Sequence, residues 1–451
     1  MATHQHSARP SARKIFTVSG FGTAMEYYDF SIYGLAAALV FPKIFFPDLS
    51  PMVGTLVSFL TFGAGFLARP LGGLVIGHFG DKVGRRPMLI LTLLVMGLST
   101  FVLGCLPTAD SVGMLAPVLL VLVRIVQGFA AGGEWGGAAL IGIESAPDDR
   151  RGLWGSFTSV GIGIGTVLGI AVFTLVSALS GDAISGAGLA GGAWRIPFLL
   201  GGVLVVFGLV MRLRAPQESA PHPGEDRKAQ PLPIFTVLRR FPAVVLCAVG
   251  ISFGYITLAY VTSVFMLTYM TEIGYGDTDN LLISLAGAIA LIPGAAFFAL
   301  LSDRIGRKKV MIGGAGLILA VYVAYFAIVP LHHLAATYAI SVVSGFVVGA
   351  AQGPIPAFLG EQFPREVRYT AISATYQVGS AIGGATAAGT ATWLLIAFDG
   401  HWIGVVGYLA VTLGVLALCS SRLRETAFEP LPENRDAEGS RSADADATAR
   451  P

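Results

Sequence analysis

Charged residues are scarce in this chain: Asp, Glu, Lys and Arg make up 12% of its 451 residues, whereas 54% are hydrophobic. Soluble globular domains carry about 25% charged residues. Cysteine is scarce as well, and Cys105, Cys247 and Cys419 all fall within apolar segments. Three such cysteines exclude a disulfide framework and indicate small buried residues. The composition therefore indicates a polytopic membrane protein.

Motifs of soluble enzymes are missing too. The sequence has no cluster of metal ligands, no nucleophile elbow and no phosphate-binding glycine loop. We therefore expect no catalytic residue, metal site, cofactor or nucleic-acid partner. Residues 1–14 lack the basic start, short apolar core and cleavage site of a secretory signal, and are expected to form a cytoplasmic tail.

Long apolar runs dominate what is present. Twelve of them approach the roughly 20 residues that a helix needs to cross a bilayer. They cover residues 15–40, 52–77, 87–105, 114–142, 153–179, 195–211, 243–270, 281–301, 310–329, 335–359, 370–398 and 402–421. With the N-terminus inside, all but four of the 29 Lys and Arg residues lie at the cytoplasmic side, as the positive-inside rule favours. The sequence predicts an all-α protein with twelve transmembrane helices and both termini in the cytoplasm.

Two internal repeats divide the chain into halves. GHFGDKVGRR (77–86) and ALLSDRIGRK (299–308) are each expected to form a basic loop between two apolar runs. Both place an Asp, a basic residue, a Gly and two more basic residues at the same spacing. The pattern E-x-x-P-x-x-x-R also occurs twice, from Glu144 to Arg151 and from Glu361 to Arg368. Repeated halves are typical of secondary transporters. The expected parts are an N-terminal tail (1–14), two pseudo-symmetric six-helix bundles (15–213 and 242–422), a Pro-rich cytoplasmic linker (214–241) and a disordered cytoplasmic tail (423–451).

Ionisable residues inside apolar runs are costly in a membrane and tend to be functional. The first half contains Glu26, Asp29, Arg69, Arg124 and Glu134. Asp29 and Arg124 are expected at similar depth, where an ion pair at about 4 Å gains about 4 kcal/mol at an effective dielectric of about 20. A substrate carboxylate that took Arg124 would free Asp29 to accept a proton, which amounts to symport. The alternative is a permanent ion pair that holds the first and fourth helices together.

The roles of the other polar residues stay open at the level of sequence. Glu26 shares a helix face with Asp29 and joins Asp29, Arg124 and Glu134 as a proton-coupling candidate. Glu134 could relay a proton, or it could pair with Arg69 or a basic loop. Arg69 could face a substrate or form a structural salt bridge. The candidate substrate-binding residues are Arg124, Gln127, Arg69, Tyr28, Tyr255, Gln352, Tyr376 and Gln377.

The repeat motifs also suggest a cytoplasmic gate. Arg85 and Arg86 could bridge to Glu144, and Glu361 could pair with Arg307 or Lys308. Such pairs would latch the two halves in one state and release them in the other; alternatively, these charges only fix the topology. The candidate gate residues are Gly77, Asp81, Gly84, Arg85, Arg86, Glu144, Arg151, Asp303, Gly306, Arg307, Glu361 and Arg368.

Several segments carry a resemblance to a known family. GFGTAMEYYDFSIYGLAAALVFPKIFFP (20–47), ARPLGGLVIGHFGDKVGRRP (68–87) and RIVQGFAAGGEWGG (124–137) resemble the major facilitator superfamily and, within it, the metabolite:proton symporter family. The resemblance implies proton-coupled import of a small metabolite, an organic acid or a zwitterion such as proline or betaine, by a monomer in a bacterial inner membrane. It also implies that Asp29 and Arg124 match positions thought to couple protons in related symporters.

Two further points bear on function. The fifth apolar run reads SVGIGIGTVLG and lacks the Gly-Pro element of drug/proton antiporters, which weighs against export. Outside transport, the alternative is a receptor or sensor built on the same scaffold. The duplicated charged motifs and the absence of any sizeable soluble segment in the sequence favour the transporter.

Overall fold

The fold is that of a computed structural model, which describes residues 11–83, 85–132, 135–180, 192–214 and 233–432. The first half contains α1 (Ala12–Leu39), α2 (Phe41–Phe45), α3 (Pro51–Val83), α4 (Arg85–Cys105), α5 (Ala109–Val112), α6 (Leu115–Ala131), α7 (Trp135–Ser145), α8 (Arg151–Leu179) and α9 (Arg195–Arg214). The second contains α10 (Pro233–Arg240), α11 (Pro242–Tyr260), the π-helix η2 (Val261–Phe265), α12 (Met266–Glu272), α13 (Asp277–Ile305), α14 (Arg307–Ile328), the 3₁₀ turn η3 (Val329–Leu331), α15 (Leu334–Gln352), α16 (Ile355–Gly360), α17 (Arg365–Ala397) and α18 (Ile403–Arg422).

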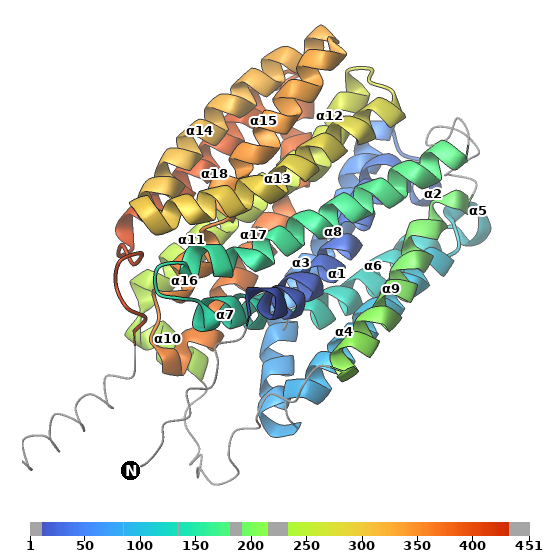
Figure 1. The fold of residues 1–451 in the computed structure, drawn as a ribbon. Helices are drawn as coiled ribbons and strands as arrows, with labels where there is room; N and C mark the ends of the chain where they lie inside the picture. The colour runs from blue at the N-terminus through green and yellow to red at the C-terminus, as the bar shows by residue number, and fades with distance from the viewer. Residues whose placement is uncertain (1–10, 84, 133–134, 181–191, 215–232, 433–451) are drawn as a thin grey trace, which may run out of the picture.

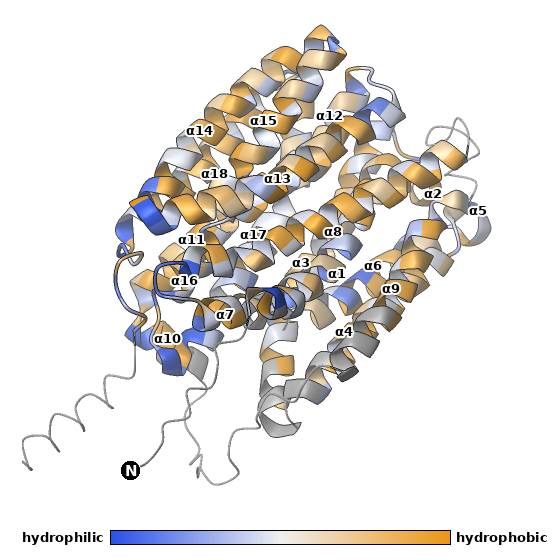
Figure 2. Ribbon diagram, viewed as in Figure 1, coloured by the Kyte–Doolittle hydropathy of each residue, from blue (hydrophilic) through white to orange (hydrophobic). Residues whose placement is uncertain are grey.

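The expected membrane spans are confirmed in part. Nine helical stretches among the described residues are long and apolar enough to cross a membrane. The other three expected spans, 15–40, 87–105 and 195–211, are also helical and correspond to α1, α4 and α9. In α4 and α9 the apolar stretches that qualify are shorter, Ile90–Cys105 and Arg195–Val206. Figure 2 shows apolar residues along the lengths of the helices and hydrophilic ones gathered toward their ends.

Helix packing repeats between the halves. In the first half α1 packs on α8, α3 on α6 and α4 on α9; in the second α11 packs on α17, α13 on α15 and α14 on α18. The halves meet where α3 packs on α17 and α8 packs on α13 (Figure 1). Corresponding helices therefore make corresponding contacts, as a duplicated chain requires.

Small residues allow the closest of these contacts. A Cβ on Gly161 or Gly165 of α8 would collide with the carbonyl oxygens of Gly20 and Ala24 on α1. Membrane helices approach one another closely where such residues line the contact. The glycine-rich fifth apolar run is thus a packing surface.

The two repeat motifs are largely helical, which corrects the prediction of loops. Helix α3 runs on to Val83 and α4 begins at Arg85; α13 runs on to Ile305 and α14 begins at Arg307. Gly306 turns the chain between α13 and α14 at a φ of 104°, which favours glycine. Hydropathy had marked where the apolar run ends, and a helix can continue beyond that point with polar residues.

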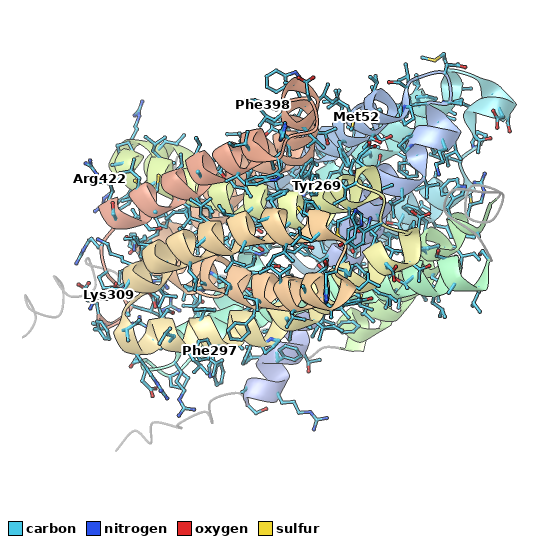
Figure 3. All side chains as sticks on the ribbon, turned by 90° about the horizontal axis from the view of Figure 1, so that it is seen from above. Met52, Tyr269, Phe297, Lys309, Phe398 and Arg422 are labelled. Atoms are coloured by element: carbon cyan, nitrogen blue, oxygen red, sulfur yellow. The ribbon has the colours of Figure 1, made fainter. Side chains whose placement is uncertain are left out.

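Two expected irregular segments also hold structure. Within the expected linker, α10 forms, packs on α17 and buries the side chain of Val237. Within the expected disordered tail, residues 423–432 are placed against the charged ends of the helices, and residues 433–451 lie outside the described part. Lys309 and Arg422 mark this end of the bundle, and Met52 and Phe398 lie well away from it (Figure 3).

Candidate functional site

Four charged side chains meet inside the first half, on α1, α3 and α6. Glu26, Asp29, Arg69 and Arg124 are exposed by 1%, 2%, 1% and 0%. Arg69 donates from Nη2 to Oε1 of Glu26 at 3.0 Å, so these two form a buried ion pair. The salt-bridge alternative for Arg69 is therefore realised in this structure. Glu134, the fifth predicted charge, lies outside the described residues.

Asp29 and Arg124 are joined by a chain of hydrogen bonds. Arg124 donates from Nη1 to Oε1 of Gln127 at 2.5 Å, and Gln127 donates from Nε2 to Thr100 Oγ1 at 2.7 Å. Thr100 donates in turn to Oδ2 of Asp29 at 2.8 Å. The Asp29 carboxylate and the Arg124 guanidinium are thus linked through the neutral side chains of Thr100 and Gln127. Thr100 was not predicted, because one hydroxyl in an apolar run gives no periodic signal.

Aromatic rings surround the two guanidinium groups. Cζ of Arg124 lies 4.1 Å from the ring centre of Tyr33 and 4.9 Å from those of Phe30 and Phe62. Cζ of Arg69 lies 4.0 Å from the ring of Phe30. A cation over an aromatic face is stabilised by about 2 kcal/mol when it is desolvated. These rings therefore stabilise the buried cations without neutralising them, and sequence reasoning missed all three.

Arg124 keeps unused hydrogen-bonding capacity. Within the described part of the chain, its Nε and Nη2 have no hydrogen-bond partner, although both are buried. A buried unsatisfied donor costs about 1–3 kcal/mol, and more when it is charged. Two guanidinium N–H groups side by side match the two oxygens of a carboxylate. The arrangement can therefore receive an anionic group.

The second half faces this cluster with neutral side chains. The Tyr376 hydroxyl lies 3.0 Å from that of Tyr27, and its ring stacks on Trp135 with centroids 3.4 Å apart. Gln377 donates from Nε2 to the carbonyl of Gly132 at 2.9 Å. In the described structure, Oε1 of Gln377 and the Tyr255 hydroxyl are buried without a hydrogen-bond partner. Tyr376 and Gln377 thus bring α17 to the first half, and Tyr255 and Gln377 keep polar atoms available.

Two other predicted substrate-binding residues make backbone contacts instead. The Tyr28 hydroxyl donates to the carbonyl of Pro197 at 2.8 Å, which ties α1 to α9. Gln352 donates from Nε2 to the carbonyl of Ser159 at 2.8 Å, and Ser159 donates from Oγ to the carbonyl of Gln352 at 2.9 Å. Both hydrogen bonds tie α15 to α8 across the halves. Their contact with a substrate stays a prediction.

A second set of charges, which we call the end network, joins the halves near the repeat motifs. Glu361 lies at its centre: Arg307 Nη2 is 3.1 Å and Arg151 Nε is 3.4 Å from its Oε1. Arg307 also pairs with Asp303 at 2.6 Å. Because Arg151 begins α8 and Arg307 begins α14, Glu361 bridges the two halves.

Two further contacts extend the end network. Asp303 accepts hydrogen bonds from the backbone N–H groups of Gly152 and Leu153, at 2.8 and 3.0 Å, and so caps α8 from the other half. Arg368 donates to Glu144 at 3.2 Å. The side chains of Arg85 and Arg86, the predicted partners of Glu144, and of Asp81 lie outside the described part. Gly77 lies within α3, and Gly84 lies outside the described part altogether.

Residues 423–432, which we call the C-terminal strap, complete the end network. Glu425 accepts from the backbone N–H groups of Arg307 and Lys308 at 2.9 and 3.0 Å, at the positive end of α14. Thr426 donates to Oε2 of Glu361 at 2.6 Å, and its carbonyl accepts from Arg151 Nη2 at 3.3 Å. The strap therefore contacts both halves, which corrects the prediction of disorder for these residues.

Comparison with known proteins identifies relatives over nearly the whole chain. The family model described as Major Facilitator Superfamily matches residues 19–388 and 281–448. An inner membrane metabolite transport protein of Escherichia coli (strain K12) is 37% identical over 95% of this chain and 98% of its own. The shikimate transporter of the same organism is 34% identical over 92% and 95%. A putative proline/betaine transporter of Staphylococcus aureus (strain COL) is 33% identical over 92% and 90%.

Solved structures share the fold. The crystal structure of a D-xylose-proton symporter superposes with a TM-score of 0.70, covering 92% of this chain and 98% of its own, at 19% identity. A partially occluded, inward-open structure of the xylose transporter of E. coli superposes with a TM-score of 0.67 over 93% and 99%, at 15% identity. At these identities the likeness concerns the fold alone.

Proposed function

Because the chain belongs to the Major Facilitator Superfamily, whose members named here are transporters and not enzymes, we propose that it is a proton-coupled symporter that imports a small organic acid. One observation carries the proposal. Arg124 is fully buried, keeps Nε and Nη2 without a partner in the described structure, and connects to Asp29 through hydrogen bonds. It offers a carboxylate a binding site with a proton acceptor attached.

The charges of the cluster favour joint binding of anion and proton. Glu26 and Asp29 carry two negative charges when ionised, and Arg69 and Arg124 carry two positive ones, so the four balance. A monocarboxylate would add one buried negative charge, and an uncompensated buried charge is expensive. One proton on Asp29 restores the balance. Anion and proton therefore stabilise each other's binding, which is the requirement for symport.

Alternating access would supply the route across the membrane. Transporters with two repeats rock one bundle against the other around a central site. The end network joins the bundles, so it holds that end closed and has to break when the end opens. We assign this end to the cytoplasm because of its many Lys and Arg residues. The proton gradient would supply the energy, and the protein would need no cofactor.

The cellular setting follows the relatives. One of them is named an inner membrane protein, and this chain shares its length and its apolar helices. We propose the same membrane for this protein, with a monomer as the working unit. Its partners would then be the lipid bilayer, protons and the small metabolite.

A zwitterion such as proline or betaine is the second candidate substrate. The site places carboxylates within the same cluster as Arg124, so it could hold both ends of a zwitterion. A relative named as a putative proline/betaine transporter is 33% identical. Competition between labelled organic acids and unlabelled betaine would separate the two: an acid transporter ignores betaine.

Uptake into proteoliposomes under an imposed pH gradient tests the proposal. Wild type should accumulate at least one compound from a panel of succinate, α-ketoglutarate, citrate, shikimate, proline and betaine, and accumulation should collapse with the gradient. Asp29→Asn should equilibrate that compound without accumulating it. Asp110→Asn, at an exposed aspartate of α5, serves as the matched control and should behave as wild type. Binding of a compound without flux would instead support a receptor.

A further inference from the structure

We propose that Thr100 is the positioning residue that couples the protonation of Asp29 to the anion affinity of Arg124. The inference rests on the proposed symport and adds the device that performs the coupling. Thr100 lies on α4, is fully buried, and stands between the two groups.

The direction of each hydrogen bond around Thr100 can be assigned. An arginine only donates, so the atom of Gln127 that faces Arg124 must be its oxygen. The Gln127 nitrogen then faces Thr100 and donates to Oγ1. Thr100 has one hydroxyl hydrogen left to place. Two acceptors lie within reach, Oδ2 of Asp29 at 2.8 Å and the carbonyl of Met96 at 3.0 Å.

With Asp29 ionised, the hydrogen of Thr100 points to the carboxylate. The chain then runs in one direction, from the cation Arg124 through Gln127 and Thr100 to the anion Asp29. Hydrogen bonds aligned head to tail polarise and strengthen one another, and those to a charged group are the strong ones. In this state Asp29 helps to satisfy Arg124 through the chain, and an external anion gains less.

With Asp29 protonated on Oδ2, the carboxylic acid donates to Thr100 Oγ1. The hydroxyl oxygen then accepts from both Asp29 and Gln127, which uses its two lone pairs, and its hydrogen turns to the Met96 carbonyl. The proton that arrived is now the O–H of Asp29, and no heavy atom has moved. The aligned chain is broken at Thr100, so Arg124 loses its link to an anion and binds a carboxylate more tightly.

Linkage makes this effect reciprocal. If protonation of Asp29 raises the affinity for the anion, the bound anion raises the affinity of Asp29 for the proton by the same factor. Coupling free energies between two sites correspond to roughly 5- to 150-fold changes in affinity. The chain through Thr100 therefore accounts for symport by a reorientation of hydrogen atoms.

The methyl group of Thr100 lies close to α9. A Cβ on Gly201 of α9 would lie 2.8 Å from the Thr100 methyl carbon and 3.2 Å from Oδ1 of Asp29. The glycine therefore leaves room for the Thr100 methyl group and the Asp29 carboxylate beside α9. Serine would keep the hydroxyl without this methyl contact, whereas valine would keep the shape without the hydroxyl.

A purely structural role must be separated from coupling, because helical threonines often bond to the carbonyl four residues back. Thr174 on α8 makes such a bond, to Ile170 at 2.8 Å, and provides the matched control. The variants are Thr100→Val, Thr100→Ser and Thr174→Val. The probe is whichever compound of the panel above wild type accumulates most.

Two readouts distinguish coupling from folding: the apparent affinity for the probe as a function of external pH, and the ratio of gradient-driven accumulation to counterflow. For Thr100→Val we expect the pH dependence of affinity to flatten and the ratio to fall by at least about fivefold. Thr100→Ser and Thr174→Val should keep the wild-type profile. If Thr100→Val does not yield folded protein, Thr100→Ala, which adds no bulk, replaces it in the same comparison.

Three results would overturn the inference. In the first, Thr100→Val keeps the wild-type pH profile, so the hydroxyl is dispensable. In the second, Thr100→Ser flattens the profile as much as Thr100→Val, so the methyl contact is what counts. Both leave the proposed symport standing if wild type accumulates the probe. In the third, wild type accumulates no compound of the panel, which rejects the proposed function together with this inference.

Discussion

The two charged regions of this molecule differ in which helices they connect. The central cluster draws Glu26, Asp29, Arg69 and Arg124 from α1, α3 and α6, all in the first half. The end network connects the halves, because Glu361 pairs with both Arg151 and Arg307. A rigid-body rotation of one half against the other leaves contacts within a half intact and separates contacts between halves.

Under the proposed function, this difference gives the two regions different tasks. The central cluster can keep its geometry through the transport cycle, as a site for proton and substrate must. The end network would then change between states, as a gate must. The two regions also differ in how fully their polar groups are paired. In the end network, Glu361 contacts Arg151, Arg307 and Thr426. In the central cluster, Arg124 keeps two N–H donors without a hydrogen-bond partner within the described structure. Paired charges between the halves stabilise the closed end, whereas unpaired donors on the Arg124 guanidinium favour binding of a ligand.

The largest expected effect comes from the centre of the end network. Glu361→Gln leaves Arg151 and Arg307 without their shared buried counter-ion, and removing one partner of a buried pair costs about 3–5 kcal/mol. The closed population should fall by roughly a hundredfold or more relative to the open one. Spin labels at the exposed positions Asp149 and Glu366, in a cysteine-free background, report the opening as a longer distance.

A matched substitution controls for loss of an acid in general. Glu272→Gln alters an exposed acid at the end of α12, outside both charged regions, and should leave the distance distribution at the wild-type value. An unchanged distribution in Glu361→Gln itself would show that the end network does not hold the halves together.

The next effect concerns the central cluster. Arg124→Lys keeps a positive charge but replaces the planar fork by a single ammonium, so it cannot pair with both carboxylate oxygens. Charged hydrogen bonds contribute about 1.5–3 kcal/mol each, so the affinity for the probe should fall about 10- to 150-fold. Competition binding to purified protein measures it. Arg195→Lys is the control, because Arg195 does not belong to the central cluster and donates hydrogen bonds to the carbonyls of Gly104 and Leu106. Equal losses in both variants would contradict a special role for Arg124.

A smaller effect concerns how the C-terminal strap is anchored. Glu425→Ala removes the acceptor at the start of α14, and losing such a helix cap costs about 1 kcal/mol. A spin label at Phe428, which is 66% exposed, should become several-fold more mobile. Wild-type mobility in this variant would mean that the contacts of Thr426 hold the strap without Glu425.

The smallest effect is expected at the surface of the same strap. Arg424 and Glu429 pair at 3.0 Å, but their side chains are 74% and 52% exposed. Exposed pairs contribute at most about 1 kcal/mol and are screened by salt. Arg424→Ala should therefore leave the mobility of the Phe428 label nearly unchanged. A change as large as that of Glu425→Ala would reverse this ranking.

The sequence predicted the positions of the helices well, but it did not predict which polar side chains pair with one another. Repeated motifs and apolar runs gave the helical class and the duplicated pairing, because both depend on residue type and spacing. Glu26 and Asp29 also lower the hydropathy of α1, so this helix, one of the three that carry the site, is absent from the nine clear spans among the described residues. Hydropathy thus identifies helices that face lipid, and it underestimates a membrane helix that carries buried acidic residues.

Contacts made by single polar atoms were out of reach of the sequence. Thr100 carries one hydroxyl in an apolar helix, and the residues next to it in sequence do not indicate that it bonds to Asp29 and Gln127. The strap is held by backbone carbonyls and by the side chains of Glu425 and Thr426, in a stretch whose polar composition predicts a disordered tail. Such contacts depend on how helices distant in sequence are placed, and only coordinates supply that.

Proton movement driven by substrate shows whether Asp29 carries the coupled proton. Proteoliposomes are loaded with a pH-sensitive dye at equal pH on both sides, and the compound that wild type accumulates is added outside. If Asp29 carries the coupled proton, the interior acidifies with wild type and stays at its starting pH with Asp29→Asn, although counterflow of the same compound persists in both. Equal acidification in the two proteins would contradict it, since the proton would then travel without that carboxylate.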